Sequence, residues 1–94
     1  MYLISYDIES NKIRNKVAKT LEDYGKRVQY SVFECHITNE RFDKLYGLLA
    51  ELMQEEEKGN IRFYNICRSC EQKLIIMGVP NEEIQELDED TIII

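Results

Sequence analysis

The chain has 94 residues, of which 44% are hydrophobic and 32% charged, a balance that supports one compact domain and excludes a disordered chain or a fibrous repeat. Its net charge is −6, but residues 82–90 hold six acids and no base, and the rest of the chain balances twelve acids against twelve bases. No apolar run approaches the roughly 18 residues of a membrane span. We therefore expect a cytoplasmic protein without a membrane partner, whose three cysteines stay as thiols.

The first predicted elements are a strand and a helix. Residues 2–6 form an apolar run that predicts a buried strand, with Asp7 emerging at its carboxyl end. Ser10 is expected to cap the following helix, and Gly25 to end it in the left-handed conformation. The apolar residues of this helix recur every three or four positions and form one face: Ile13, Val17, Leu21 and Tyr24.

The same helix carries a basic stripe. Residues 12–27 hold six bases and two acids, so a positive surface exists inside a neutral body. Lys12, Lys16 and Lys19 follow one side of the helix, with Arg14 at the margin of the apolar face. The stripe is compatible with nucleic-acid binding, although a solvated helix face is the more common reason for such a pattern.

Residues 27–37 alternate apolar and polar side chains over a length that exceeds a typical strand, so we expect two strands with a bend near Tyr30 and Ser31. From Thr38 the period becomes helical and continues to the Gly59-Asn60 turn. The apolar face of this second helix consists of Phe42, Leu45, Leu49, Leu52 and Met53. Residues 61–66 predict a strand, residues 67–71 a turn, and residues 74–77 a further strand.

This order predicts an α+β, ferredoxin-like βαββαβ fold with an additional C-terminal strand. The domain is expected to span residues 1–78, and residues 79–94 form an acidic tail in which residues 91–94 are a candidate edge strand. Both helices should cover one face of the sheet. The bare face should then meet a second copy, which predicts a homodimer.

Three features are candidates for chemistry. Asp7 is a natural ligand for a hard cation, although an aspartate after a strand is also an ordinary turn former. Because Mg²⁺ needs only one or two carboxylates, a two-fold axis that joins two Asp7 side chains would suffice. Cys67 and Cys70 form a single CxxC pair, which favours a structural turn over a zinc site, and the pair is expected to precede a strand rather than to open a helix as redox pairs do. His36, the one histidine, is expected to be a half-exposed strand residue.

Several segments resemble the CRISPR-associated protein 2 family. The matching segments are Tyr6-Asp7-Ile8, Arg14-Asn15-Lys16-Val17, the block from Gly25 to Glu34 that contains Val-Gln-Tyr-Ser-Val-Phe, and Ile66-Cys67-Arg68-Ser69-Cys70. The resemblance covers roughly residues 1–78 in the same order and spacing. It implies a ferredoxin-like homodimer whose last strands cross to the partner's sheet, metal-dependent cleavage of single-stranded RNA or double-stranded DNA, and assembly with the CRISPR integrase during spacer acquisition.

The resemblance also implies roles for individual residues. Asp7 matches the metal-binding acid of the family, and Tyr6, Arg14, Arg27 and Phe33 match residues implicated in activity. Lys16 stands where some members carry arginine, so it keeps the charge without a bidentate grip on phosphate.

Two functions are compatible with these residues. In the first, two Asp7 side chains hold Mg²⁺ while Arg14 and Arg27 stabilise charge on the phosphorane, and Tyr6 and Phe33 orient the site, stack on a base or pack. In the second, a non-catalytic dimer bridges integrase subunits and binds duplex DNA through basic side chains. These side chains are Lys12, Arg14, Lys16, Lys19 and Arg27.

Overall fold

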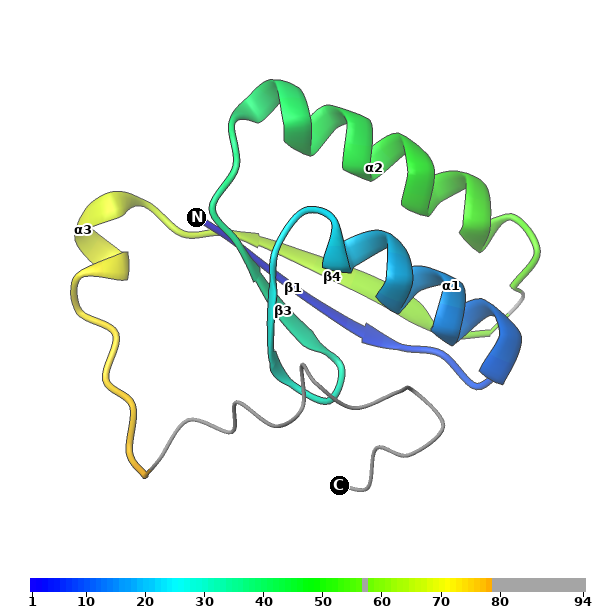
Figure 1. Ribbon diagram of the computed structural model, residues 1–94, viewed down its shortest axis with the longest axis horizontal. Coiled ribbons are helices and arrows are strands. Elements are labelled where there is room, and N and C mark those ends of the chain that lie inside the picture. Colours follow the sequence, from blue (N-terminus) through cyan, green and yellow to red (C-terminus); the bar gives the residue numbers. More distant parts are fainter. Residues whose placement is uncertain (57, 79–94) are drawn as a thin grey trace.

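The computed structural model describes residues 1–56 and 58–78, which form a four-stranded antiparallel sheet, two long helices and one short helix (Figure 1). The elements are β1 (Tyr2–Asp7), α1 (Asn11–Glu22), β2 (Lys26–Gln29), β3 (Val32–Cys35), α2 (Asn39–Met53), β4 (Asn60–Asn65) and α3 (Arg68–Glu71). The strand order β2-β3-β1-β4 is that of the split βαβ fold, so the predicted α+β, ferredoxin-like arrangement is confirmed. Among the described residues, no helix has the length and apolar character needed to cross a bilayer.

The core lies between the sheet and the pair α1 and α2, which pack against each other on one side of it (Figure 1). Ile4 sits opposite Phe33 on β3 and Phe63 on β4, so these three side chains share the helix-covered face. The helices contribute fully or nearly fully buried apolar residues, namely Ile13, Val17, Ala18, Leu21, Leu45 and Leu49. The predicted apolar faces of both helices are therefore confirmed.

Both long helices begin at a side-chain cap, and the cap at Ser10 is the predicted one. The hydroxyl of Ser10 accepts the N–H of Ile13 at 3.3 Å, and that of Thr38 accepts the N–H of Arg41 at 3.2 Å. Each hydroxyl satisfies one of the amide groups that an isolated helix start leaves without a partner. The cap at Ser10 also fixes where the chain turns from β1 into α1.

Gly25 corrects one detail of the prediction, because it does not adopt the left-handed conformation. Among the described residues, positive φ occurs only at Gly59 and Gly78. A glycine is required at position 25 for space, since a Cβ there would lie 2.4 Å from the Cys35 Sγ and 2.5 Å from the Glu34 carbonyl oxygen. The end of α1 is thus pressed against β3, and side-chain size rather than backbone conformation selects the glycine.

The predicted division of residues 27–37 into two strands is confirmed. β2 ends at Gln29 and β3 starts at Val32, and the pairing register shifts between Arg27 and Gln29. The chain turns at Tyr30 and Ser31, as predicted, without a glycine or proline.

The segment after β4 differs from the prediction. Residues 67–71 contain the short helix α3 rather than a simple turn, and residues 74–77 form no strand. Ile75 is 86% exposed and Met77 is 97% exposed. An apolar segment becomes a strand only beside another strand with free backbone groups, and the four-stranded sheet of one chain does not take this segment up. The candidate edge strand at residues 91–94 and the acidic tail lie outside the described residues.

The face of the sheet opposite the helices carries mixed side chains. Leu3 pairs with Glu34 and Tyr64, so these residues share one row across the sheet. Ser5, Val32 and Arg62 form the next row. No helix of the described chain covers this face, as expected for a fold with both long helices on one side (Figure 1).

Candidate active site

Asp7 is the last residue of β1 and pairs with Asn60, the first residue of β4. Its side chain is exposed, whereas those of Tyr6 and Ile8 on either side of it are buried. Because alternate residues of a strand point to opposite faces, Asp7 lies on the same side as Leu3 and Ser5, away from the core. The sheet thus presents one carboxylate to solvent from a rigid strand end.

The connection between α2 and β4 supports the backbone at Asp7. Gly59 has φ +105°, and a Cβ at this position would lie 2.4 Å from the Asp7 carbonyl oxygen. The Glu56 carboxylate accepts the N–H of Ser10 at 3.3 Å and the N–H of Lys58 at 3.1 Å. This connection therefore packs against the strand end and binds the start of α1.

Arg14 on α1 binds the loop between β1 and α1. Its Nη1 donates to the carbonyl oxygen of Ile8 at 3.0 Å, and its Nη2 donates to the side-chain oxygen of Asn11. The guanidinium is half-buried. Arg14 thus holds the turn that immediately follows Asp7, so the structure places this predicted residue beside the candidate site.

Tyr6, Phe33 and Arg27 lie inside the protein. Phe33 has no exposed surface and Tyr6 is 5% exposed, so both are packing residues, which is one of the roles foreseen for them. The Arg27 guanidinium carbon lies 5.2 Å from the centre of the Phe33 ring, and the residue is 4% exposed. In this structure a base cannot stack on Phe33 and a phosphate cannot reach Arg27, because both side chains are buried on the helix-covered face of the sheet.

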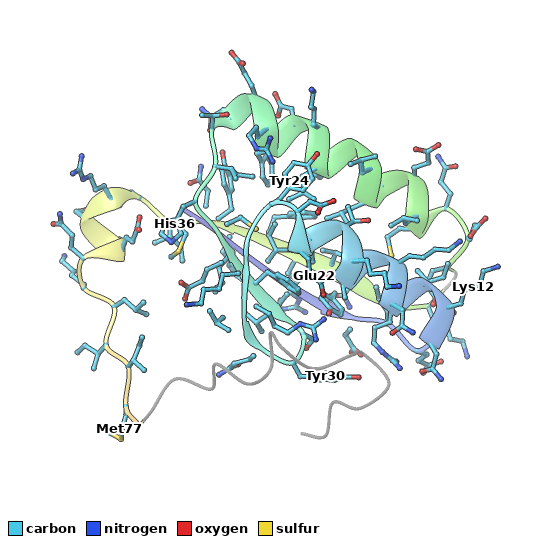
Figure 2. All side chains as sticks on the ribbon, viewed as in Figure 1. Lys12, Glu22, Tyr24, Tyr30, His36 and Met77 are labelled. Carbon is cyan, nitrogen blue, oxygen red and sulfur yellow. The ribbon has the colours of Figure 1, made fainter. Side chains whose placement is uncertain are left out.

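The three lysines of the stripe lie on the solvent side of α1. Lys12, Lys16 and Lys19 are all exposed, and the helix buries Ile13 and Val17 on its opposite side. Lys12 projects from the first turn, where α1 begins near the end of β1 (Figure 2). The structure therefore brings the start of the basic stripe and Asp7 to the same end of the molecule.

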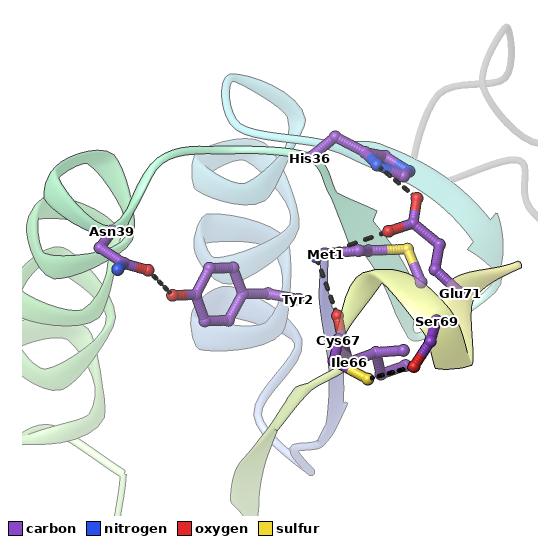
Figure 3. A network of polar contacts seen from close by, with 8 residues as sticks. All are labelled: Met1, Tyr2, His36, Asn39, Ile66, Cys67, Ser69 and Glu71. Atoms are coloured by element: carbon purple, nitrogen blue, oxygen red, sulfur yellow. Dashed lines mark hydrogen bonds and ion pairs between the residues drawn. The ribbon is translucent and has the colours of Figure 1, made fainter.

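The histidine and the cysteines are not part of the candidate site at Asp7. Figure 3 shows His36 beside Glu71, and the His36 Nδ1 is 3.1 Å from a carboxylate oxygen of Glu71. Cys35 is buried, and this burial raises the pKa of its thiol to about 11. Within residues 1–56 and 58–78, no three His, Cys, Asp or Glu side chains gather into a metal site. His36 is more than half exposed, as expected, although it follows β3 instead of belonging to it.

Residues 1–74 match the family model described as CRISPR associated protein Cas2. The chain belongs to this Cas2 family. A Chloroflexus aurantiacus relative named CRISPR-associated endoribonuclease Cas2 1 is 42% identical, over 92% of this chain and 95% of its own length. A Halalkalibacterium halodurans relative named CRISPR-associated endonuclease Cas2 is 33% identical, over 92% of this chain and 95% of its own length.

Solved Cas2 structures have the same fold. The crystal structure of Streptococcus pyogenes Cas2 at pH 6.5 superposes with a TM-score of 0.70 and 33% identity, over 82% of this chain and 98% of that chain. A chain of a structure titled partial Cas6-RT-Cas1--Cas2 complex gives a TM-score of 0.72 and 35% identity, over 86% of this chain and 88% of that chain. The family membership expected from the sequence motifs is confirmed.

Within this Cas2 fold, two supporting residues escaped the sequence analysis. Glu56 stands in a run of acidic residues before Lys58, a pattern typical of a solvated helix end, and no local signal distinguishes it from Glu55. Gly59 was recognised as part of a turn, but its contact with the Asp7 backbone joins residues distant in sequence. Only the pairing of β1 with β4 brings these residues together.

Proposed function

We propose that this Cas2-family chain is a metal-dependent endonuclease of the CRISPR adaptation machinery, with Asp7 as the metal ligand. The observation that carries the proposal is the exposed Asp7 carboxylate at a supported strand end, in a chain whose relatives are named endoribonucleases and endonucleases. The substrate is RNA or DNA, and the bond cleaved is a phosphodiester.

The donor set fits a hard cation. Asp7 offers carboxylate oxygen, which Mg²⁺ prefers, and Mg²⁺ keeps most of its waters when only one or two carboxylates bind it. One Asp7 from each of two copies would hold the ion in a homodimer. A bound Mg²⁺ would supply an acidified water and neutralise charge on the scissile phosphate. The residues of this chain position the ligand: Arg14 and Glu56 bind the loop after Asp7, and Gly59 lets β4 start beside it.

The charge distribution supports nucleic acid as the substrate. Lys12, Lys16 and Lys19 are exposed on α1 and can contact successive phosphates, while Arg14 lies between this stripe and Asp7. Arg27 is buried against Phe33, so in this arrangement it supports the core and does not contact the substrate. In this arrangement the lysines bind the backbone of the substrate and the strand end carries the chemistry.

The decisive experiment compares Asp7→Asn with the wild type on labelled single-stranded RNA and duplex DNA, with and without Mg²⁺. The substitution keeps the shape of an exposed side chain and removes its charge, so we expect cleavage to fall by roughly 100-fold or more without loss of stability. Glu9→Gln is the matched control, since Glu9 is an exposed acid two residues away. Equal cleavage by Asp7→Asn and the wild type would reject the assigned role.

A second function is favoured by the similarity to a chain of the Cas6-RT-Cas1--Cas2 complex. Here the protein is a dimeric scaffold that binds the CRISPR integrase and grips duplex DNA, with no need for Asp7. The two functions separate experimentally, because catalysis depends on Asp7 and the metal ion, whereas the grip depends on the lysine stripe and on salt.

A further inference from the structure

The Cys67-Arg68-Ser69-Cys70 motif lies in a different context from the one the sequence predicts. β4 ends at Asn65, and Cys67 is the capping residue of α3, so the pair follows a strand and opens a helix. A redox CxxC motif likewise follows a strand and opens a helix, although α3 has only four residues. The expectation that the pair precedes a strand was the reason to set a redox role aside, and the structure removes this reason.

The helix α3 is fixed to the body of the protein. A Glu71 carboxylate oxygen lies 3.7 Å from the Met1 ammonium and another lies 3.1 Å from the His36 Nδ1 (Figure 3). The Met1 ammonium also donates to the carbonyl oxygen of Ile66 at 3.1 Å. The two cysteines are therefore held at a defined place beyond the end of β4, although both are exposed to reagents.

The Cys67 thiol is hydrogen-bonded to the hydroxyl of Ser69. The Cys67 Sγ is 3.2 Å from the Ser69 Oγ (Figure 3). Hydrogen bonds from the Ser69 hydroxyl, and then from the backbone and thiol of Cys70, lower the pKa of Cys67 to about 7. The hydrogen bond and the charge of Cys67 raise the pKa of Cys70. Cys67 is thus the more nucleophilic thiol, whereas Cys70 keeps its proton.

We propose that Cys67 and Cys70 form a dithiol site that exchanges with a small-molecule disulfide such as oxidised glutathione and closes to an intrachain disulfide. The Cys67 thiolate attacks one sulfur of the small disulfide, whose S–S bond breaks and releases one thiolate. Cys70 then loses its proton, and its sulfur attacks the Cys67 sulfur of the mixed disulfide and releases the second thiolate. The two protein thiols are oxidised by two electrons, and the small disulfide is reduced to two thiols.

The test treats the full chain with oxidised glutathione at pH 7, stops the reaction with acid and identifies the products by mass spectrometry of peptides. The wild type is expected to yield the Cys67–Cys70 disulfide. Cys70→Ser should instead accumulate one glutathione on Cys67, and Cys67→Ser should react at least about tenfold more slowly, because the thiol with the lowered pKa is lost. Cys35 is the internal control in every sample, because it is buried and should stay unmodified.

A second measurement keeps the proposal independent of folding defects in the variants. The rate of alkylation of Cys67 in the wild type should rise about tenfold between pH 6 and pH 8, as expected for a thiol with a pKa near 7. Equal reactivity of Cys67 and Cys70, or a stable adduct on wild-type Cys67 that does not close to the disulfide, would overturn the proposal. Neither readout requires nuclease activity or a metal ion.

Discussion

The contact of Gly59 with the strand end determines how the Asp7 backbone is held. The space next to the Asp7 carbonyl oxygen is too small for any side chain at position 59, and the φ of +105° disfavours every residue other than glycine. Gly47, in contrast, lies on the exposed side of α2, where an added Cβ would meet no atom within 4 Å. An added methyl group would therefore clash at position 59 and meet no atom at position 47.

This difference gives a matched prediction. Gly59→Ala should lower the free energy of unfolding by about 1–3 kcal/mol, through strain at a positive φ and the clash with Asp7. Gly47→Ala should raise it by about 0.5–1 kcal/mol, because alanine is the better helix former. Thermal unfolding measures both effects. Equal stability of Gly59→Ala and the wild type would mean that the connection between α2 and β4 is not held against β1.

At the scale of elements, α1 presents its lysine stripe to solvent. Replacing Lys12, Lys16 and Lys19 by glutamine should weaken nucleic-acid binding and reduce the slope of log affinity against log salt by about 2–3, because each phosphate contact releases counterions. Binding is measured by fluorescence anisotropy with labelled duplex DNA at several salt concentrations. Since these lysines are exposed, the stability of the fold should not change by more than about 0.5 kcal/mol.

The control for the stripe is a triple variant with the same change of charge elsewhere. Lys44, Lys58 and Lys73 are exposed on or near other elements, so their replacement by glutamine should leave most of the affinity in place. An equal loss in both triple variants would show that net charge alone drives binding and that α1 is not the nucleic-acid surface.

The elements also indicate what the sequence can and cannot predict. The periodic apolar residues of α1 and α2 predict both helices, because each helix buries one face against the sheet. The apolar residues 74–77 predict a strand wrongly, because their composition specifies burial but not the neighbour that provides it. Asp7 is predictable from its place after a strand, whereas the burial of Arg27 depends on its register opposite Phe33.

At the scale of the whole molecule, one chain leaves apolar residues uncovered at two places. Leu3, Val32 and Tyr64 lie on the uncovered face of the sheet. Ile75 and Ile76 are 86% and 62% exposed in the segment after α3. We expect a second copy, related by a two-fold axis, to cover these residues, and the proposed shared metal site needs the same axis to pair two Asp7 side chains. The homodimer stays a prediction, which the exposed apolar residues and the proposed shared metal site both support.

Sedimentation tests this prediction directly. At micromolar concentration the wild type should sediment with twice the mass of one chain, and Ile75→Asp with Ile76→Asp should shift it toward the monomer, because a charge cannot be buried at an apolar interface without a partner. Leu48→Asp is the control, since Leu48 is exposed on α2, on the helix side of the sheet. Metal-dependent cleavage should fall together with dimer content, because each copy supplies one carboxylate. A monomeric wild type that cleaves at full rate would contradict the shared site.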